Sequence, residues 1–288
     1  MFNIFITDII LVVIAIIWLI AASITDIKKR EVADWLSFSL LAIALAINAL
    51  KSVLTLNASY FLYSVLGAAI FFVIALVFYR TKVFGGGDAK LLIALGAAFA
   101  TQPIFANSLN LPFQYHEPFL LTFVINILVI GAIYGIIFSL VLAFKNRKKF
   151  SDSFKKGNKE NNKIFYFILA IVVLLLALIT HTYNILFLAV VILILPYLFA
   201  FVKASESTMI RFKGWKDLAE GDWLVQKLKI KNKILKPTVD GLTKQDILQI
   251  KKANKKVLIK DGIPFVPAIL IALILSIFIG NLLLLLMI

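Results

Sequence analysis

The sequence has no cysteine and only two histidines, His116 and His181. The absence of cysteine excludes disulfides, thiol nucleophiles and cysteine metal sites. Two histidines that lie far apart in the sequence cannot by themselves make a zinc site. Any chemistry must therefore use carboxylates, amides, hydroxyls or the backbone, and we expect neither a metal nor a cofactor.

Polar residues are also scarce. Of the 288 residues, 62% are hydrophobic and 16% are charged, and the mean hydropathy is +0.99. A soluble domain of this length needs more polar surface, and several runs here reach the roughly 20 apolar residues that span a bilayer. The composition predicts an all-α polytopic membrane protein with about eight transmembrane helices, at about residues 4–24, 35–52, 60–79, 89–107, 119–144, 164–180, 184–202 and 264–288.

Acidic residues are half as common as basic ones, 15 against 30, and the formal net charge is +15. If the N-terminus lies outside the cell, 29 of the 30 basic residues fall on the cytoplasmic side, and only Lys51 falls outside. Basic residues concentrate in cytoplasmic loops, so this bias predicts that both termini lie outside. We expect the basic face to lie on anionic membrane lipids rather than on nucleic acid, because membrane insertion alone accounts for the bias.

The charge pattern also divides the chain. Residues 1–202 are expected to form a membrane domain, 203–263 a basic cytoplasmic segment and 264–288 a C-terminal transmembrane helix. Within the segment, "GLTKQDILQIKKANKK" predicts a short helix, with Thr243 and Asp246 spaced as a capping box. The polar run "NRKKFSDSFKKGNKENNK", before the sixth apolar stretch, predicts a flexible connector.

Polar residues near membrane depth are costly and need a reason. Asp8 and Glu117 fall on the outer side in this topology, and we expect both to be interfacial or solvated. Asn48 and Asn126 lie within apolar spans, where interhelical packing is their simplest role. The same role is expected for Gly131 and Gly135, which have a G-x-x-x-G spacing.

Asp26 and Asp88 stand apart from the other acids. Asp26 ends the first apolar run where the chain reaches the cytoplasm, and Asp88 opens the fourth run where the chain leaves it. The topology therefore places both carboxylates at one leaflet, although they are 62 positions apart in sequence. Two neighbouring carboxylates share a proton, because both cannot ionise cheaply. The ionised one can then activate water while the protonated one binds a peptide carbonyl, which is aspartic peptidase chemistry.

Three glycines, Gly85, Gly86 and Gly87, precede Asp88 in "VFGGGDAKLL". Glycine permits positive φ angles and close backbone approach. We expect this hinge to let an extended substrate strand lie beside Asp88. The alternative is a flexible interhelical loop in which Asp88 only caps the following helix.

With Asp26 and the glycines in view, the sequence resembles the GxGD aspartic peptidases that process type IV pilin-like precursors, above all the archaeal prepilin and preflagellin peptidases. The family motif falls on Gly85, Gly86, Gly87 and Asp88, followed by Lys90. The second motif falls on "TDIKKREVAD", with Asp26 as its catalytic member and Asp34 as an accessory position. The resemblance implies a six-helix core, which leaves the hairpin 164–202 as an addition.

Family membership implies a substrate with a short basic leader before an apolar helix, cut at the cytoplasmic membrane face. Glu31 and Asp34 could attract the leader's positive charges, or could pair with Lys28, Lys29 or Arg30 instead. The missing cysteines, and a chain that starts directly with the first helix, imply a peptidase without methyltransferase activity. Whether pilins, archaellins or other precursors are cut stays open.

Two other functions remain as alternatives to an endopeptidase. The first is an ion-coupled secondary transporter that uses membrane-embedded carboxylates. Transporters usually place such sites at the midplane of internally repeated folds, whereas these acids lie at helix ends and no repeat is visible. The second is a non-catalytic scaffold, which would place no mutual constraint on Asp26 and Asp88.

Overall fold

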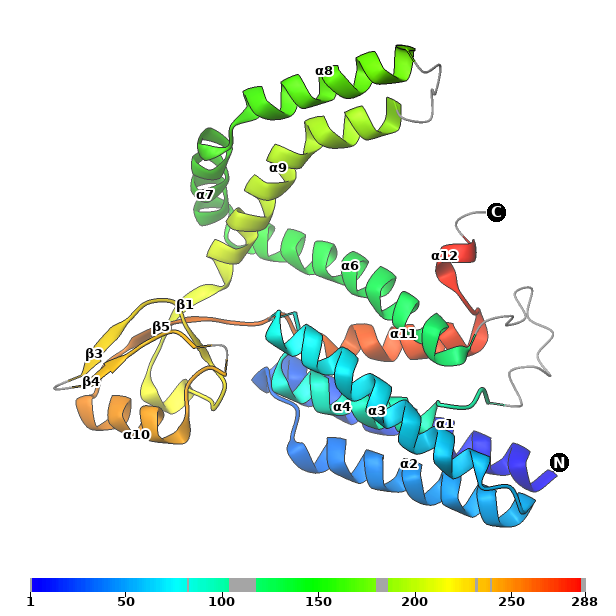
Figure 1. Ribbon diagram of the computed structural model, residues 1–288. Helices are drawn as coiled ribbons and strands as arrows, with labels where there is room; N and C mark the ends of the chain where they lie inside the picture. The colour runs from blue at the N-terminus through cyan, green and yellow to red at the C-terminus, as the bar shows by residue number, and fades with distance from the viewer. Residues whose placement is uncertain are drawn as a thin grey trace. The chain divides into compact units, whose positions relative to one another are not determined.

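The computed structural model describes residues 2–81, 83–103, 118–179, 186–230, 233–238 and 240–285 (Figure 1). The chain divides into two compact units, one of residues 1–136 with 262–288 and the other of residues 137–261. The predictions for Glu117, His116 and His181 fall outside the described residues. Each unit is treated separately below.

The first unit is a bundle of long and short helices (Figure 1). It contains α1 Phe2–Lys29, α2 Asp34–Thr55, α3 Ser59–Arg80, α4 Gly86–Ala98, the first part of α6 Phe119–Lys145, α11 Val266–Phe278 and the short α12 Leu282–Leu285. The second unit contains the end of α6, α7 Arg147–Glu160, α8 Lys163–Ile179, α9 Leu186–Met209 and a small mixed region of strands and helix.

In the part of the chain that is described, five helices are long and apolar enough to cross a membrane, or six if the bent pair α7 and α8 counts as one span. The five are Ile4–Lys29, Asp34–Thr55, Ser59–Arg80, Phe119–Lys145 and Leu188–Met209. The prediction of a helical membrane protein is confirmed at this level. The count of eight and the orientation stay predictions.

Two helices of the first unit, α4 and α11, are shorter than the roughly 20 residues that usually span a bilayer. Each has 13 residues, or about 20 Å at 1.5 Å per residue. The last carbonyls of such helices have no intrahelical donor and must find partners in an apolar environment. Buried asparagines of the longer helices supply them.

At the end of α4, the side-chain amide of Asn48 in α2 donates to the carbonyl of Ala97 at 3.2 Å. The hydroxyl of Ser64 in α3 donates to the same carbonyl at 2.7 Å. The expectation of interhelical packing for Asn48 is confirmed, and the contact also explains why an amide is needed there. These two hydrogen bonds pair a backbone carbonyl at the end of α4 that has no partner within the helix.

Asn126 pairs backbone groups in the segment that follows α11. The predicted helix 264–288 is interrupted after Phe278, and Gly280 there has a positive φ of 95°. The Asn126 amide donates to the carbonyl of Gly280 at 2.7 Å and to the Ser276 hydroxyl at 2.9 Å. Its side-chain oxygen accepts from the backbone N–H of Leu282 at 3.0 Å, at the start of α12. One buried side chain thus bridges the break.

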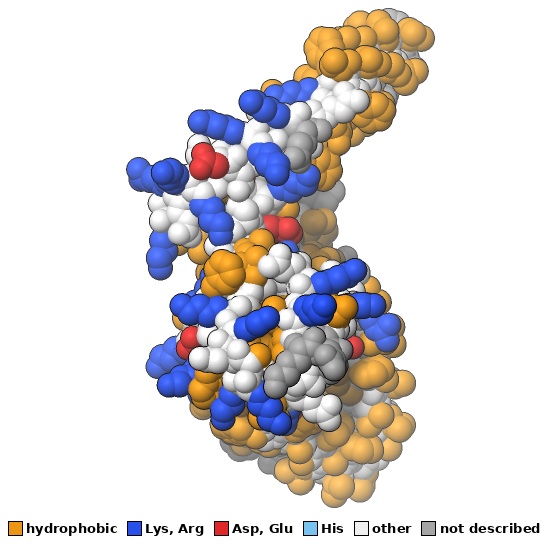
Figure 2. Space-filling model, turned by 90° about the vertical axis from the view of Figure 1, so that its left-hand side faces the viewer, with side chains coloured by type: hydrophobic (Ala, Val, Ile, Leu, Met, Phe, Trp, Pro, Cys, Tyr) orange, Lys and Arg blue, Asp and Glu red, His pale blue; other side chains and the backbone are white. Residues whose placement is uncertain are grey.

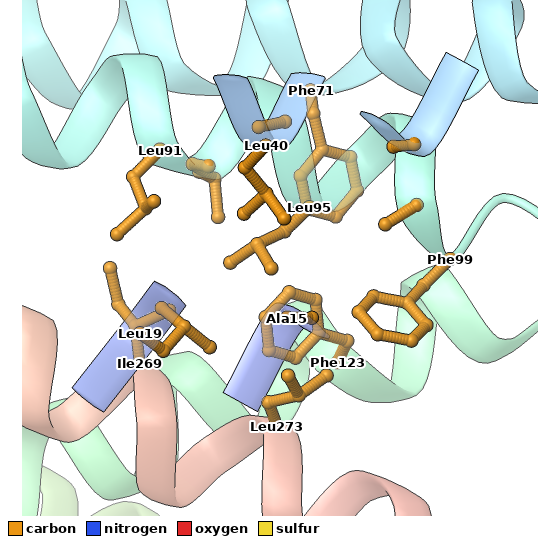
Figure 3. Packing of buried hydrophobic residues seen from close by; sticks show 14 of the residues in the cluster. Ala15, Leu19, Leu40, Phe71, Leu91, Leu95, Phe99, Phe123, Ile269 and Leu273 are labelled. Atoms are coloured by element: carbon orange, nitrogen blue, oxygen red, sulfur yellow. The ribbon is translucent and has the colours of Figure 1, made fainter. Parts of the chain in front are cut away.

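The core of this unit is built around α4, which contacts α2 and α3. Figure 3 shows Leu91 and Leu95 of α4 facing a layer of apolar side chains from α1 and α11. Gly67 of α3 and Gly96 of α4 lie so close that a Cβ on either would overlap the other helix. Small residues allow this approach in membrane bundles, and it fixes the depth of α4.

The contact between Asp8 and Lys51 shows that the prediction for Asp8 was wrong. Asp8 was expected at the interface or in solvent, but it is buried and forms an ion pair with the equally buried Lys51 of α2. Lys51, the basic residue that the predicted topology leaves outside, is therefore buried rather than solvated. An acid in α1 and a base in α2 neutralise each other at membrane depth, where a single charge would be costly.

The second unit corrects two further expectations. The run from Arg147 to Glu160 is not a flexible connector but the helix α7. Its Phe150 and Phe154, one turn apart, form an apolar stripe, and the Phe150 ring lies 5.6 Å from that of Phe201 in α9. A polar sequence with one apolar stripe forms a stable helix when a neighbouring helix covers that stripe.

The segment after α9 also contains strands, which the all-α prediction did not include. The antiparallel strands β1 Ile210–Lys213, β5 Val257–Lys260 and β2 Trp223–Leu224 form a sheet in the order β1-β5-β2. β3 Leu228–Ile230 pairs with β4 Lys233–Leu235, and η2 Trp215–Asp217 is a short 3-10 turn. The helix α10 Lys244–Ala253 begins with the predicted capping box of Thr243 and Asp246, which is confirmed. This strand-containing region has a small hydrophobic core of its own, which includes Ile250, Val257 and Ile259.

Candidate active site

Asp26 lies in the last turn of α1 and is 5% exposed. Its carboxylate accepts a hydrogen bond from the backbone N–H of Val266, with 3.0 Å between Oδ2 and N. Val266 is the first residue of α11, so this N–H is one of the donors that a helix start leaves unpaired. The positive end of the α11 dipole also points at an anion held there. These two interactions stabilise the carboxylate form of Asp26 and offset part of the cost of burying it.

Asp88 is the third residue of α4 and is 8% exposed. Its carboxylate accepts the N–H of Gly85 at 3.0 Å, as the third residue of a capping box does. Burial, and next the negative charge of Asp26, raise the pKa of Asp88 to about 7, and the Gly85 hydrogen bond opposes this shift. The negative charge of Asp26 thus acts on Asp88, and the placement of the two acids at one leaflet stays a prediction. Asp88 holds a proton under conditions in which an ordinary aspartate has lost it.

The three glycines differ from the expectation in one respect. None of Gly85, Gly86 and Gly87 has a positive φ in the structure. Close approach accounts for Gly87, because a Cβ there would lie only 2.8 Å from the Cβ of Val32. A Cβ on Gly86 would meet nothing nearer than 3.8 Å. The packing of α4 against the loop after α1 thus requires glycine at position 87.

That loop begins at Arg30, which has a left-handed φ of 61° and ends α1. Its N–H donates to the carbonyl of Asp26 at 2.8 Å. Its guanidinium donates to the carbonyl of Gly262, four residues before α11 begins. Arg30 therefore fastens the end of α1 to the same segment that supplies the Val266 N–H.

Aromatic contacts join this segment to the glycine motif. The ring of Phe84, immediately before Gly85, lies 4.9 Å from the ring of Phe265. Phe265 precedes Val266 and packs on Gly131 of α6, where a Cβ would overlap its ring. The expected packing role is therefore confirmed for Gly131, whereas a Cβ on Gly135 would meet no described atom within 4 Å.

Asp34 and Lys90 lie at the exposed rim of this region. The Lys90 ammonium is 2.6 Å from Asp34 Oδ1, and it also lies 5.6 Å from the centre of the Phe38 ring. The pair joins the start of α2 to the first turns of α4. Asp34 thus pairs with Lys90, not with the basic residues at the end of α1, and Glu31 is exposed.

Three contributors were not identified from the sequence: Arg30, the Phe265–Val266 backbone, and Tyr134. Tyr134 lies one turn after Gly131 in α6 and interacts electrostatically with Asp26 and Arg30. The stretch "GIPFVP", residues 262–267, where the basic segment gives way to the last apolar run, was a signal for the second. Tyr134 is an isolated tyrosine inside an apolar run, and nothing in the sequence indicated its contribution. Within the described ranges no cluster of His, Asp or Glu could hold a metal ion, and the metal-free chemistry stays a prediction.

These observations define a class of protein: a helical membrane protein with two buried, interacting aspartates at helix ends. Comparison with known families agrees with that class. Residues 13–138 match the family model of the type IV leader peptidase family. The predicted resemblance is thereby confirmed. The matched residues include both aspartates, the three glycines and Tyr134, but not α11.

The similar curated proteins come from archaea. A preflagellin peptidase of Methanococcus maripaludis is 28% identical over 136 residues, covering 46% of this chain and 57% of that protein. The prepilin peptidase EppA of Methanothermobacter thermautotrophicus is 24% identical over 147 residues, or 50% of this chain and 38% of that protein. A preflagellin peptidase of Methanocaldococcus jannaschii is 33% identical over 85 residues, which cover 30% of this chain and 36% of that one.

The matches thus span between 36% and 57% of these relatives' length. No solved structure matches the chain.

Proposed function

We propose that this protein is an aspartic endopeptidase that removes the short basic leader from type IV pilin-like precursors, pilins or archaellins, at the cytoplasmic face of the cell membrane. The observation that carries the proposal is that Asp26, in the last turn of α1, and Asp88, in the first turn of α4, are both buried and each accept a backbone hydrogen bond at a helix start. The names of the similar proteins support the substrate class. They give no support to the transporter alternative.

In the proposed reaction the two acids have different tasks. Asp26, held by the Val266 N–H, is the carboxylate that takes a proton from a water molecule. Asp88, with its raised pKa, is the acid that donates a hydrogen bond to the scissile carbonyl oxygen. Water oxygen bonds to the carbonyl carbon, and a tetrahedral intermediate forms. Proton transfer to the amide nitrogen then lets the carbon–nitrogen bond break.

The other residues of the motif serve as supports in this proposal. Gly85 donates its N–H to Asp88, Gly87 lets α4 approach Val32, and Gly86 leaves open backbone for an extended substrate. Lys90 and Asp34 form the rim pair, and Glu31 and Asp34 are proposed to attract the basic leader. No metal or cofactor takes part.

The proposal keeps the predicted topology: about eight spans, an outside N-terminus, a membrane peptidase domain 1–202, a cytoplasmic segment 203–263 and a last span 264–288. Because the chain has no cysteine, single engineered cysteines report one position each. Leu56→Cys should react with a membrane-impermeant maleimide in intact cells, and Ser151→Cys only after lysis. The reverse pattern contradicts the orientation.

The activity is tested by co-expressing a pilin-like precursor with the protein and following the precursor's size. Asp26→Asn and Asp88→Asn should each abolish cleavage, while the amount of protein in the membrane stays unchanged. Asp152→Asn, an exposed acid in α7, is the matched control and should cleave normally. Full processing by either active-site variant rules out the pair.

A further inference from the structure

The hairpin of α8 and α9 contains a pocket that the proposed peptidase reaction does not use. Its volume is about 400 Å³, and its lining includes Ile164, Phe167, Leu193 and Pro196. Lys163 and Tyr197 complete the lining together with Tyr166. The size falls within the range of about 300–1,000 Å³ that is typical of small-ligand sites, and all but a small part of the lining is apolar.

Lys163 lies at a chemical boundary of the chain. The preceding helix α7 is rich in lysine, and α8 begins at Lys163 and is apolar from Ile164 to Ile179. α7 and α8 meet at a bend of 63°. Figure 2 shows basic side chains gathered at the base of the hairpin, whose outer part is covered by hydrophobic side chains. An ammonium group at such a boundary lies at the level of lipid phosphates.

Specific contacts hold Lys163 over the pocket. The side-chain amide of Asn161 donates to the carbonyl of Pro196, inside α9. The backbone N–H of Lys163 donates to the carbonyl of Asn161 at 2.9 Å. The ammonium lies 5.0 Å from the centre of the Tyr197 ring. Among the described side chains, no carboxylate forms an ion pair with Lys163.

From the pocket and the placement of its one charge, we propose that the α8–α9 hairpin binds an anionic phospholipid. The phosphate pairs with Lys163 beside Tyr197, and an acyl chain lies against Ile164, Phe167 and Leu193. A membrane-facing apolar pocket suits the chain, and a single cation at its headgroup end selects an anionic lipid over a zwitterionic one. This inference does not depend on the peptidase activity.

The test uses the full chain, purified in detergent and stripped of lipid. Native mass spectrometry would follow the binding of phosphatidylglycerol and of phosphatidylcholine, and the first should bind more tightly. Lys163→Met should weaken phosphatidylglycerol binding roughly fivefold, the value of about one interfacial lysine, and Lys163→Arg should retain it. Lys155→Met removes the same charge from α7, outside the pocket, and should bind as the wild type does.

Leu193→Trp fills the pocket, leaves the charge in place and should also weaken binding. Inorganic phosphate in excess separates the two sources of the anion. If phosphate binds alone and Leu193→Trp has no effect, the site takes a free anion and the lipid proposal is wrong. An equal loss in Lys155→Met and Lys163→Met, or equal binding of the two lipids, would show diffuse attraction to the basic surface and would also overturn it.

Discussion

The carboxylate of Asp26 accepts a hydrogen bond from the backbone N–H of Val266, 240 positions further along the chain. This contact makes the start of α11 a part of the candidate site, although α11 lies outside the residues that match the family. Two helix starts therefore serve the two acids. Asp26 is held by the first N–H of α11, and Asp88 lies in the first turn of α4.

Arg30 is predicted to position Asp26. Replacing it with glutamine removes the guanidinium that donates to the Gly262 carbonyl, so the Val266 N–H would no longer be held in register with Asp26. We expect the cleavage rate to fall about tenfold, the order of one charged hydrogen bond, with unchanged membrane level. Lys29→Gln is the matched control at the neighbouring exposed position. Equal rates in both variants would leave Arg30 without this role.

The pH dependence of cleavage should have a falling limb near neutrality. The pKa of Asp88 is raised to about 7, by burial first and by the charge of Asp26 second. Below that pH Asp88 retains the proton that binds the scissile carbonyl, and above it the proton is lost. Cleavage measured in detergent or vesicles should therefore decline above about pH 7. A rate that stays level to pH 9 contradicts the assignment of Asp88 as the acid.

The same shift affects stability with a definite sign. Between about pH 4 and pH 7 the folded protein holds a proton on Asp88 that the unfolded chain has released. The contribution of Asp88 to the free energy of unfolding therefore falls as the pH rises through this window. Thermal unfolding of Asp88→Asn, which cannot ionise, should depend less on pH there than unfolding of the wild type does.

Gly87 and Gly86 make a matched pair for the packing of α4. Gly87→Ala would place a Cβ 2.8 Å from the Cβ of Val32, and a Cβ at position 86 would meet nothing nearer than 3.8 Å. Overpacking of this kind costs about 1–3 kcal/mol, so Gly87→Ala should lower the unfolding temperature and the cleavage rate. Gly86→Ala, at the first residue of α4, should preserve the unfolding temperature. Equal behaviour of the two variants would show that the approach to Val32 is not limiting.

The Asp8–Lys51 pair should behave as a buried ion pair remote from the chemistry. Lys51→Met alone leaves a buried carboxylate without its ammonium partner, which typically costs roughly 3–5 kcal/mol. The double variant Asp8→Leu with Lys51→Met should recover most of that loss, because apolar replacement of a whole buried pair is often neutral. Thermal unfolding in detergent measures both. A double variant as unstable as the single one would mean that the charges have further partners that matter.

Several local features could be predicted from the sequence because short-range rules decide them. The capping box at Thr243 is an example, since it depends on a spacing of three residues. Asn48 and Asn126 could be placed in interhelical contacts, but not at the ends of α4 and α11, because the lengths of those helices were not evident. The helix α7 was missed because its polar composition hides the stripe of Phe150 and Phe154, which is stable only against α9.

The sequence by itself determined the membrane class and the charge asymmetry, and it predicted that Asp26 and Asp88 lie at one leaflet, because hydropathy and charge act on each segment separately. Only the tertiary structure decided that α11 supplies the donor to Asp26, that Gly87 is needed for Val32 rather than for a positive φ, and that Lys51 neutralises Asp8. These depend on distances between side chains from separate helices. Such distances follow from how the helices pack, which no pattern along one segment contains.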